Sequence, residues 1–340
     1  MSNNDGLITD FSIGAKDALA CIFSLSGEVL TDQERALFQT ANPFGFILFK
    51  RNCKEPHQIK ALVDDLKKSV GRDCPILIDQ EGGRVQRLGP PHWRRFPPMQ
   101  EFGEAYNIDQ NNGLEQLRFE ILRLAEELVE IGVNVNCAPV LDVFFDDAHD
   151  IIGDRAFGSD PEVIARLGLS VCRHFLHSGV VPIMKHIPGH GRAHADSHFD
   201  LPRVNASYED LLNTDFAPFR MLSASDVGAN IWAMTAHIIF ESIDTNHPVS
   251  VSKHAIDKVI RGDIGFDGIL ISDDLDMKAL DAYGSASDKA LASLEAGCDL
   301  ALYCSGEFNK MQDLAENLPK LSAETLKRLQ KAGGYGKDAA

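Results

Sequence analysis

The sequence predicts an α/β protein that forms a single-domain (β/α)8 barrel of the TIM type. Eight short apolar, β-branched runs alternate with longer amphipathic stretches, a pattern typical of βαβ units and a parallel sheet. The 340 residues fit one barrel, which typically needs about 250 residues or more. An open doubly wound sheet is the alternative, but no G-x-G-x-x-G loop follows the first predicted strand.

The predicted strands are the apolar runs at 20–25, 45–49, 75–79, 133–140, 181–186, 229–237, 268–273 and 300–304. Helical periodicity predicts helices between most of them, at 31–40, 57–70, 112–131, 161–178, 208–224, 252–261 and 286–296. The first helix opens with Thr31 three residues before Glu34, which is the spacing of a capping box. Two more helices are expected at 309–318 and 323–332. We therefore expect one catalytic barrel domain, 1–340, with a core of about 18–305 and C-terminal helices within 306–333.

Charge and hydropathy argue against several classes of protein. The chain has 33 Lys and Arg against 50 Asp and Glu, a net charge of −17. This balance disfavours a nucleic-acid partner and a polybasic membrane anchor, because both need a basic surface. The polar N-terminus does not follow a signal-peptide pattern, and no apolar run reaches the ~18 residues of a membrane span. We expect a cytoplasmic protein with no nucleic-acid or membrane partner; the sequence indicates no oligomeric state.

The spacing of the cysteines and histidines bears on whether the chain could bind a metal ion. The seven cysteines are scattered without C-x-x-C spacing, which argues against a disulfide framework or a zinc–cysteine site and favours small core residues. Four histidines recur at intervals of four: His186, His190, His194 and His198. On a helix they would form a stripe of metal ligands, but Pro188 and two glycines interrupt any such helix. We therefore expect no metal ion and no cofactor.

Polar residues are concentrated where the predicted strands end. The carboxyl ends of barrel strands form the face that carries the chemistry, so these side chains should converge on one pocket. These residues are the segment 79–84, Asn136, Asp142, Lys185, His186, His237 and the segment 272–274, with Arg155 on the loop after the fourth strand. A single Asp at a strand end is more often a helix N-cap, and a lone His more often a satisfied polar residue. Several such strand ends together indicate a functional site.

Five stretches at these positions carry a family resemblance: 78–87, 138–142, 154–158, 185–198 and 272–277. The most specific is Lys-His-Ile-Pro-Gly-His-Gly through Asp-Ser-His at 185–198, followed by Asp-Gln-Glu-Gly-Gly-Arg at 79–84. Weaker support comes from 45–52 and 296–299. Together they resemble the β-N-acetylglucosaminidases of glycoside hydrolase family 3, in the single-domain type of peptidoglycan recycling. The likeness runs from about residue 20 to residue 305.

The resemblance implies a retaining exo-β-N-acetylglucosaminidase that forms a covalent intermediate. Asp273, directly after Ser272, matches the family nucleophile. His198 matches the general acid/base and Asp196 its partner. The positions that match residues binding the terminal N-acetylglucosamine are Asp79, Arg87, Arg155, Lys185 and His186. The implied substrate is a small sugar, a GlcNAc-containing muropeptide such as GlcNAc-anhydroMurNAc.

The implied acid/base pair is chemically suited to hydrolysis with retention of the anomeric configuration. A retaining glycosidase needs a nucleophile on one face of the anomeric carbon and a proton donor near the leaving oxygen. Imidazole has an unperturbed pKa near ~6.5 and can both give and take a proton near neutrality. The sequence departs from the family pattern at Ile187, where Phe is common, and at Arg192 and His194. These departures bear on loop packing and on aglycone preference.

Other functions remain open on the sequence. Asp273 and Asp274 could be the acidic pair of a substrate-assisted hexosaminidase, although neighbours in an extended strand point to opposite faces, which favours one nucleophile. A phosphorolytic enzyme is a second alternative, because an imidazole would not repel phosphate. A metal-dependent barrel hydrolase and a catalytically silent sugar-binding protein are the others.

Overall fold

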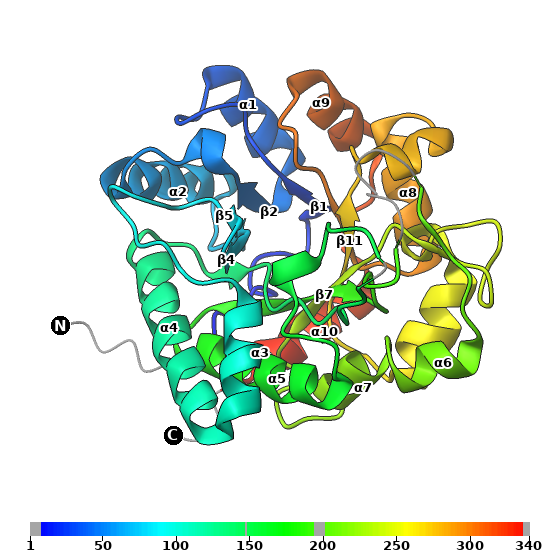
Figure 1. Ribbon diagram of the computed structural model, residues 1–340. Coiled ribbons are helices and arrows are strands. Elements are labelled where there is room, and N and C mark those ends of the chain that lie inside the picture. Colours follow the sequence, from blue (N-terminus) through cyan, green and yellow to red (C-terminus); the bar gives the residue numbers. More distant parts are fainter. Residues whose placement is uncertain (1–7, 147, 194–200, 336–340) are drawn as a thin grey trace.

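The computed structural model describes residues 8–146, 148–193 and 201–335. Eight parallel strands close into a barrel that is surrounded by helices (Figure 1). In order around the barrel they are β1 (Leu19–Phe23), β2 (Pro43–Leu48), β3 (Ile76–Ile78), β6 (Val135–Asn136), β7 (Val181–Ile187), β9 (Trp232–Thr235), β11 (Leu270–Asp274) and β12 (Leu300–Leu302). Each strand overlaps one predicted range, so the predicted (β/α)8 barrel is confirmed.

The helices of the outer layer follow the amphipathic stretches of the sequence. They are α1 (Asp32–Ala41), α2 (Pro56–Val70), α3 (Met99–Ile108), α4 (Gln110–Glu130), α5 (Pro161–His177), α6 (Tyr208–Asn213), α7 (Ala217–Ser223), α8 (Ala286–Ala296), α9 (Phe308–Asn317) and α10 (Ala323–Ala332). The capping box of α1 is present: Glu34 N–H donates to Thr31 Oγ1 at 3.2 Å, and Thr31 N–H donates to Glu34 Oε2 at 2.9 Å.

Shorter elements occupy the loops. The 3₁₀ segments are η1 (Lys50–Asn52), η2 (Gly153–Arg155), η3 (Val249–Val251) and η5 (Lys278–Tyr283), and η4 (Ala255–Asp263) is π-helical. An antiparallel hairpin joins β4 (Gln80–Gly82) to β5 (Val85–Gln86), and β8 (Arg203–Val204) pairs in parallel with β10 (Ile239–Phe240). The hairpin matters most for the site, because it lies directly after barrel strand β3.

The structure differs from the predicted helices in three places. Helix α3 was not predicted; it lies along α4 (Figure 1). The helix expected at 208–224 is divided into α6 and α7, and Pro218, which lacks an N–H, is in the first turn of α7. The α-helix expected at 252–261 is instead the π-helical η4.

Apolar side chains close the amino-terminal end of the barrel. The buried ring of Trp232, at the start of β9, packs against Phe11 and Phe44, with ring centroids 5.9 and 6.2 Å away. The seven cysteines form no disulfide, and all except the half-buried Cys53 are buried, in agreement with their predicted role as core residues. This packing leaves the opposite, carboxyl end of the strands for polar side chains.

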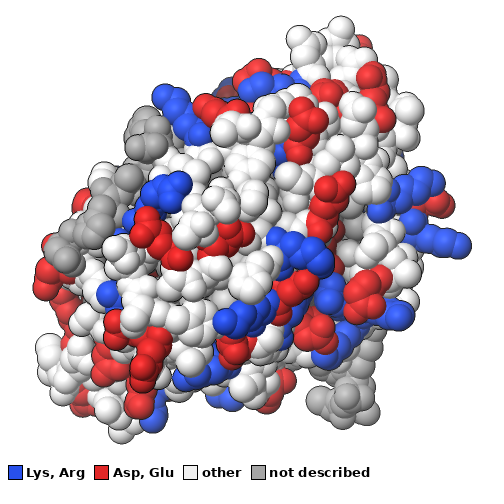
Figure 2. All heavy atoms as spheres, turned by 90° about the vertical axis from the view of Figure 1, so that its right-hand side faces the viewer, with Lys and Arg blue, Asp and Glu red and all other residues white. Residues whose placement is uncertain are grey.

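The surface matches the mixed composition of the chain. On the face shown in Figure 2, acidic and basic side chains are interspersed. Within the described residues, no helix combines the length and the apolar character that a membrane crossing requires.

Candidate active site

A cavity of about 490 Å³ opens at the carboxyl ends of the barrel strands. Its lining includes the predicted site residues Asp79, Arg87, Arg155, Lys185, His186 and Asp273. They come from the end of β3, the end of the hairpin, η2, β7 and β11, so segments far apart in sequence meet here. The predicted acid/base pair, Asp196 and His198, lies outside the described residues.

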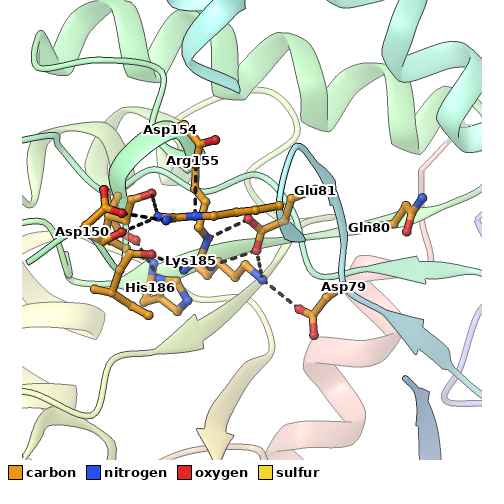
Figure 3. A network of polar contacts seen from close by, with 12 residues as sticks. Asp79, Gln80, Glu81, Asp150, Asp154, Arg155, Lys185 and His186 are labelled. Carbon is orange, nitrogen blue, oxygen red and sulfur yellow. Dashed lines mark hydrogen bonds and ion pairs between the residues drawn. The ribbon is translucent and has the colours of Figure 1, made fainter. Parts of the chain in front are cut away.

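Lys185 joins two carboxylates at the floor of the cavity (Figure 3). Its buried Nζ is 2.9 Å from Asp79 Oδ1 and 2.6 Å from Glu81 Oε1. Burial alone would lower the pKa of Lys185, but the two carboxylates outweigh it and hold this pKa above its usual value. Lys185 is therefore a charged donor in a fixed position.

Asp79 is held from both sides. Its Oδ2 accepts a hydrogen bond from Arg87 Nη2 at 2.9 Å, while Oδ1 faces Lys185. Burial opposes ionisation of Asp79, but the two cations offset it and keep its pKa well below the usual range. The group is thus a carboxylate that can accept hydrogen bonds from a ligand.

Arg155 forms a bidentate ion pair with Glu81. Arg155 Nε is 2.8 Å from Oε2 and Nη2 is 2.9 Å from Oε1, while Nη1 donates to the Ile151 carbonyl at 3.0 Å. Burial would raise the pKa of Glu81, but Arg155 and Lys185 lower it to about 2. The sequence places Glu81 in the polar segment after the third predicted strand, but it was assigned no individual role. The signal was available, because Glu81 follows Asp79 by two residues and extended chain points such residues to one side.

Gln80, between these two carboxylates, points away from the cluster (Figure 3). Its Oε1 accepts from the backbone N–H of Arg87 at 2.9 Å and of Leu88 at 3.0 Å, and its Nε2 donates to the Leu88 carbonyl at 3.1 Å. The amide therefore fixes the segment that presents the Arg87 guanidinium.

Arg84 ties the hairpin to the loop that carries Arg155. Its Nη1 is 3.0 Å from Asp150 Oδ2 and its Nε is 3.1 Å from Asp154 Oδ1. Its Nη2 also donates to the Ile152 carbonyl at 3.1 Å. These contacts hold the hairpin and the loop that carries Arg155 together at the edge of the cavity.

Asp142 organises the two histidines at the end of β7. Its Oδ1 accepts from the backbone N–H of His186 at 3.1 Å and of His190 at 2.6 Å. Its Oδ2 is 2.7 Å from His186 Nδ1. Burial would raise the pKa of Asp142, but the contacts with His186 outweigh it and lower this pKa. Because the acceptor is a carboxylate, His186 Nδ1 carries the proton.

Asp273 and Asp274 both line the cavity. The strand register shifts between Ile271 and Asp274, next to this pair. The two carboxyl groups nevertheless differ. Asp274 Oδ1 accepts from the backbone N–H of Asp276 at 3.1 Å and of Cys304 at 3.2 Å. Burial, with a smaller contribution from Asp273, raises the pKa of Asp274 to about 6.

His237, another strand-end histidine, supports the wall of the cavity. It is fully buried, with Nδ1 2.6 Å from Ser250 Oγ and Nε2 3.0 Å from the Asp274 carbonyl. Burial lowers the pKa of His237, which favours the neutral ring. This residue fits the alternative of a satisfied polar side chain.

Arg192, one of the departures from the family pattern, has a defined packing role. Its Nε is 2.7 Å from Oδ2 of the buried Asp215, between α6 and α7. Its guanidinium also lies over the Phe145 ring, 4.3 Å from the centroid. Arg192 therefore anchors the segment after β7 to the outer helices.

The histidine spacing does not assemble metal ligands within the described part of the chain. In residues 8–146, 148–193 and 201–335, no three His, Cys, Asp or Glu side chains are grouped to hold a metal ion. The rings of His186 and His190 have centroids 5.4 Å apart, whereas His194 and His198 lie outside these ranges.

Comparison with known proteins identifies the family. The model of the glycosyl hydrolase family 3 N terminal domain matches residues 25–332. The chain belongs to glycoside hydrolase family 3. The resemblance drawn from the sequence motifs is thereby confirmed.

Individual relatives agree with this assignment. The chain is 35% identical over 308 residues to a curated β-hexosaminidase of Thiobacillus denitrificans, covering 91% of this chain and 81% of the relative. It matches NagZ from Neisseria gonorrhoeae, solved with N-trifluoroacetyl-D-glucosamine, at 30% identity and a TM-score of 0.85, covering 93% and 90%. It also matches a family 3 β-N-acetylglucosaminidase from Paenibacillus at 30% identity and a TM-score of 0.82, covering 96% of this chain but 61% of that one. The chain is thus a glycoside hydrolase of the β-hexosaminidase type.

Proposed function

We propose that this family 3 protein is a retaining exo-β-N-acetylglucosaminidase that removes non-reducing terminal N-acetylglucosamine through a covalent glycosyl–Asp273 intermediate. The observation that carries the proposal is the arrangement of Asp273 with charged hydrogen-bonding side chains around one cavity. The cavity, at about 490 Å³, lies within the roughly 300–1,000 Å³ typical of small-molecule sites. The N-trifluoroacetyl-D-glucosamine bound in the Neisseria relative supports a GlcNAc-type ligand.

The binding groups are suited to sugar hydroxyls. Asp79 is ionised and accepts hydrogen bonds, while Lys185 and Arg155 are permanent donors whose charges are balanced by buried carboxylates. His186 is fixed by Asp142. A preformed set of donors and acceptors of this kind would orient one sugar ring without rearrangement.

Asp273 is the preferred nucleophile of the two adjacent aspartates. Asp274 commits an oxygen to two backbone N–H groups, and its raised pKa leaves it partly protonated near pH 6. A protonated carboxyl group is a poor nucleophile. We therefore assign the attack on the anomeric carbon to Asp273 and the proton transfer to His198, with Asp196 stabilising its imidazolium.

A 5-fluoro-N-acetylglucosaminyl fluoride tests the covalent step. The proposal requires mass spectrometry of the inactivated, digested protein to find the sugar on the peptide that contains Asp273. In Asp274→Asn the adduct should still form, whereas in Asp273→Asn it should not. An adduct on any other residue would overturn the assignment. A panel of 4-nitrophenyl β-glycosides tests specificity, and cleavage of the N-acetylglucosaminide should exceed that of the glucoside and xyloside.

A substrate-assisted mechanism is the second candidate, because Asp274 also lines the cavity and has a pKa of about 6. In that mechanism the substrate acetamido group attacks, and no enzyme-linked sugar forms. A thiazoline inhibitor would then bind tightly, and the fluoro sugar would leave Asp273 unmodified. Phosphorolysis is distinguished by comparing products with and without inorganic phosphate.

The natural substrate that we propose is a GlcNAc-anhydroMurNAc muropeptide, cleaved in the cytoplasm during cell-wall recycling. This part rests on the likeness to the single-domain family type. Release of free N-acetylglucosamine from purified muropeptides, followed by chromatography, tests it. If no N-acetylglucosamine is released from muropeptides while the 4-nitrophenyl substrate is still cleaved, the muropeptide is not the substrate. The proposed removal of terminal N-acetylglucosamine would then stand without it.

A further inference from the structure

The outer face of helix α4 carries three apolar side chains in one stripe. Phe119, Leu122 and Val129 recur at helical spacing, on the side opposite the buried Leu124 and Leu128. Phe119 is 51% exposed and Val129 is 40% exposed, while Leu122 is half-buried. Helix α4 packs against α3 and α5, and Figure 1 shows it at the outside of the barrel. A stripe of this kind indicates a surface that another molecule covers.

The carboxyl-terminal half of the stripe is hollowed. A cavity of about 420 Å³ is lined there by Leu122, Glu126, Val129 and Glu130 of α4, together with Ser178, which follows α5. The leucine and the valine give this hollow an apolar surface, and the two exposed glutamates give it negative charge. The hollow therefore suits an apolar group that has a positive charge beside it.

The amino-terminal half of the same stripe presents such a group. The Arg123 guanidinium lies over the exposed Phe119 ring, 4.3 Å from its centroid. Within the described chain, the ion pairs of α4 are formed by Glu115, Arg118 and Glu120. Arg123 and the two glutamates of the hollow thus keep their charges available for a partner.

We propose that this stripe is the contact surface between two copies of the chain, whose α4 helices pack antiparallel about a two-fold axis. Phe119 of one copy enters the hollow of the other, as a knob enters a hole between two helices. Arg123, which accompanies that ring, then lies beside Glu126 of the partner subunit and Glu130 of the partner subunit. The centre of the hollow is about eight residues, or ~12 Å, from Phe119 along the helix. The two-fold axis repeats the contact, so both rings and both hollows are occupied.

A second copy fits this surface because the ring and the hollow that complement each other lie on one helix. The net charge of −17 opposes self-association, so a dimer requires opposite charges where the copies touch. A parallel pair of helices would place Arg123 against Arg123 and Glu126 against Glu126, whereas the antiparallel pair places unlike charges together. One helix face is a small interface, and we expect a weak dimer that forms with rising protein concentration.

Two charge-reversal variants test the pairing by sedimentation velocity over a series of concentrations. Arg123→Glu places a carboxylate against the two glutamates of the hollow. The double variant Glu126→Arg, Glu130→Arg places two cations against Arg123. Each variant alone should associate at least about tenfold more weakly than the unchanged protein, because like charges then meet at both symmetry-related contacts. An equimolar mixture of the two restores opposite charges at both contacts and should associate as the unchanged protein does.

Two controls separate the interface from a general effect of charge. Lys327→Glu reverses a charge on α10, at a side chain that is 74% exposed, and should leave the Kd within about twofold. Val129→Asp places a carboxylate in the hollow and should weaken the dimer, whereas Val29→Asp, at a valine that is 68% exposed before α1, should not. Thermal denaturation verifies that each variant is folded.

A chain that stays monomeric at every concentration overturns the interface. So does a mixture of the two charge-reversal variants that associates no better than its components, or a Lys327→Glu variant that weakens the dimer as much as Arg123→Glu does. The inference is independent of the proposed glycosidase function, because no residue of α4 lines the active-site cavity. All variants should therefore cleave the 4-nitrophenyl substrate at the original rate, and loss of the dimer leaves the proposed function standing.

Discussion

Glu81 and Arg155 form a bidentate ion pair whose two contacts measure 2.8 and 2.9 Å, although 74 residues separate them in the sequence. The Glu81 side chain is 2% exposed and that of Arg155 10% exposed. The pair joins the hairpin after β3 to η2, and Lys185 joins it from β7. Three separate segments of the barrel rim therefore depend on one carboxylate.

Replacing this carboxylate should destabilise the protein. In Glu81→Gln the buried charges of Arg155 and Lys185 lose the carboxylate that they share. Breaking a buried ion pair lowers the free energy of unfolding by about 3–5 kcal/mol. Urea denaturation should show this loss in the free energy of unfolding. Glu115→Gln is the control, because Glu115 pairs with Arg118 on the surface at 70% and 52% exposure, and it should change stability by about 0.5 kcal/mol or less. Similar losses in both variants would contradict the prediction.

The Asp142 carboxylate should matter for turnover through His186. In Asp142→Asn the amide oxygen can still accept from the backbone, but its NH2 group cannot accept from His186 Nδ1. A hydrogen bond to a charged group is worth about 1.5–3 kcal/mol, so kcat/KM should fall roughly 10- to 100-fold. Asp226→Asn, at an exposed ion pair with Arg173, serves as the control and should leave kcat/KM unchanged.

Asp274 should make stability fall as pH rises. Burial raises its pKa from 3.8 to about 6, so the folded protein binds this proton more tightly than the unfolded chain does. The stabilisation is complete below pH 4 and is lost as pH rises through 6, a change of about 3 kcal/mol. The free energy of unfolding of the unchanged protein, minus that of Asp274→Asn, should decline accordingly between pH 4 and pH 7.

The comparison with Asp274→Asn is needed because His190 changes the free energy of unfolding with pH in the opposite direction. Burial, with a contribution from His186, lowers the pKa of His190 from 6.5 to about 4. Its contribution is therefore complete above pH 6.5 and is lost as pH falls toward 4. The difference between the two proteins cancels this effect. A difference that stays constant with pH would refute the raised pKa of Asp274.

The sequence predicted the barrel and the main charged residues of the cavity lining because both follow from local patterns. Apolar runs and strand-end polar residues are visible in one dimension, and the family motifs selected Asp79, Lys185 and Asp273. What sequence analysis did not find depends on tertiary geometry. The register shift beside Asp274 and the pairing of Glu81 with Arg155 both depend on how segments far apart in the sequence meet.

The packing of α3 gives a stability test away from the cavity. A Cβ at Gly103 would lie 1.6 Å from the Phe157 carbonyl oxygen, so the helix and this backbone would have to separate. Gly103→Ala should destabilise the fold by about 1–3 kcal/mol, as overpacking does. At Gly27 a Cβ would meet nothing within 4 Å, and Gly27→Ala should leave stability unchanged or raise it slightly. Thermal denaturation of both variants checks this, and a stable Gly103→Ala would show that the α3 contact can relax.

The acid/base role that we propose for His198 leads to a prediction that depends on the leaving group. His198→Ala should lower kcat by roughly 10²–10⁴-fold on substrates with poor leaving groups, the usual contribution of a general acid/base. A 2,4-dinitrophenyl glycoside needs little protonation as it departs, so its glycosylation step should be nearly unaffected, whereas a 4-methylphenyl glycoside should suffer the full loss. Single-turnover rates across a series of aryl N-acetylglucosaminides measure this as a steeper dependence on leaving-group pKa. Equal losses across the series would assign the proton transfer to another residue, because a group that does not protonate the leaving oxygen cannot distinguish between these substrates.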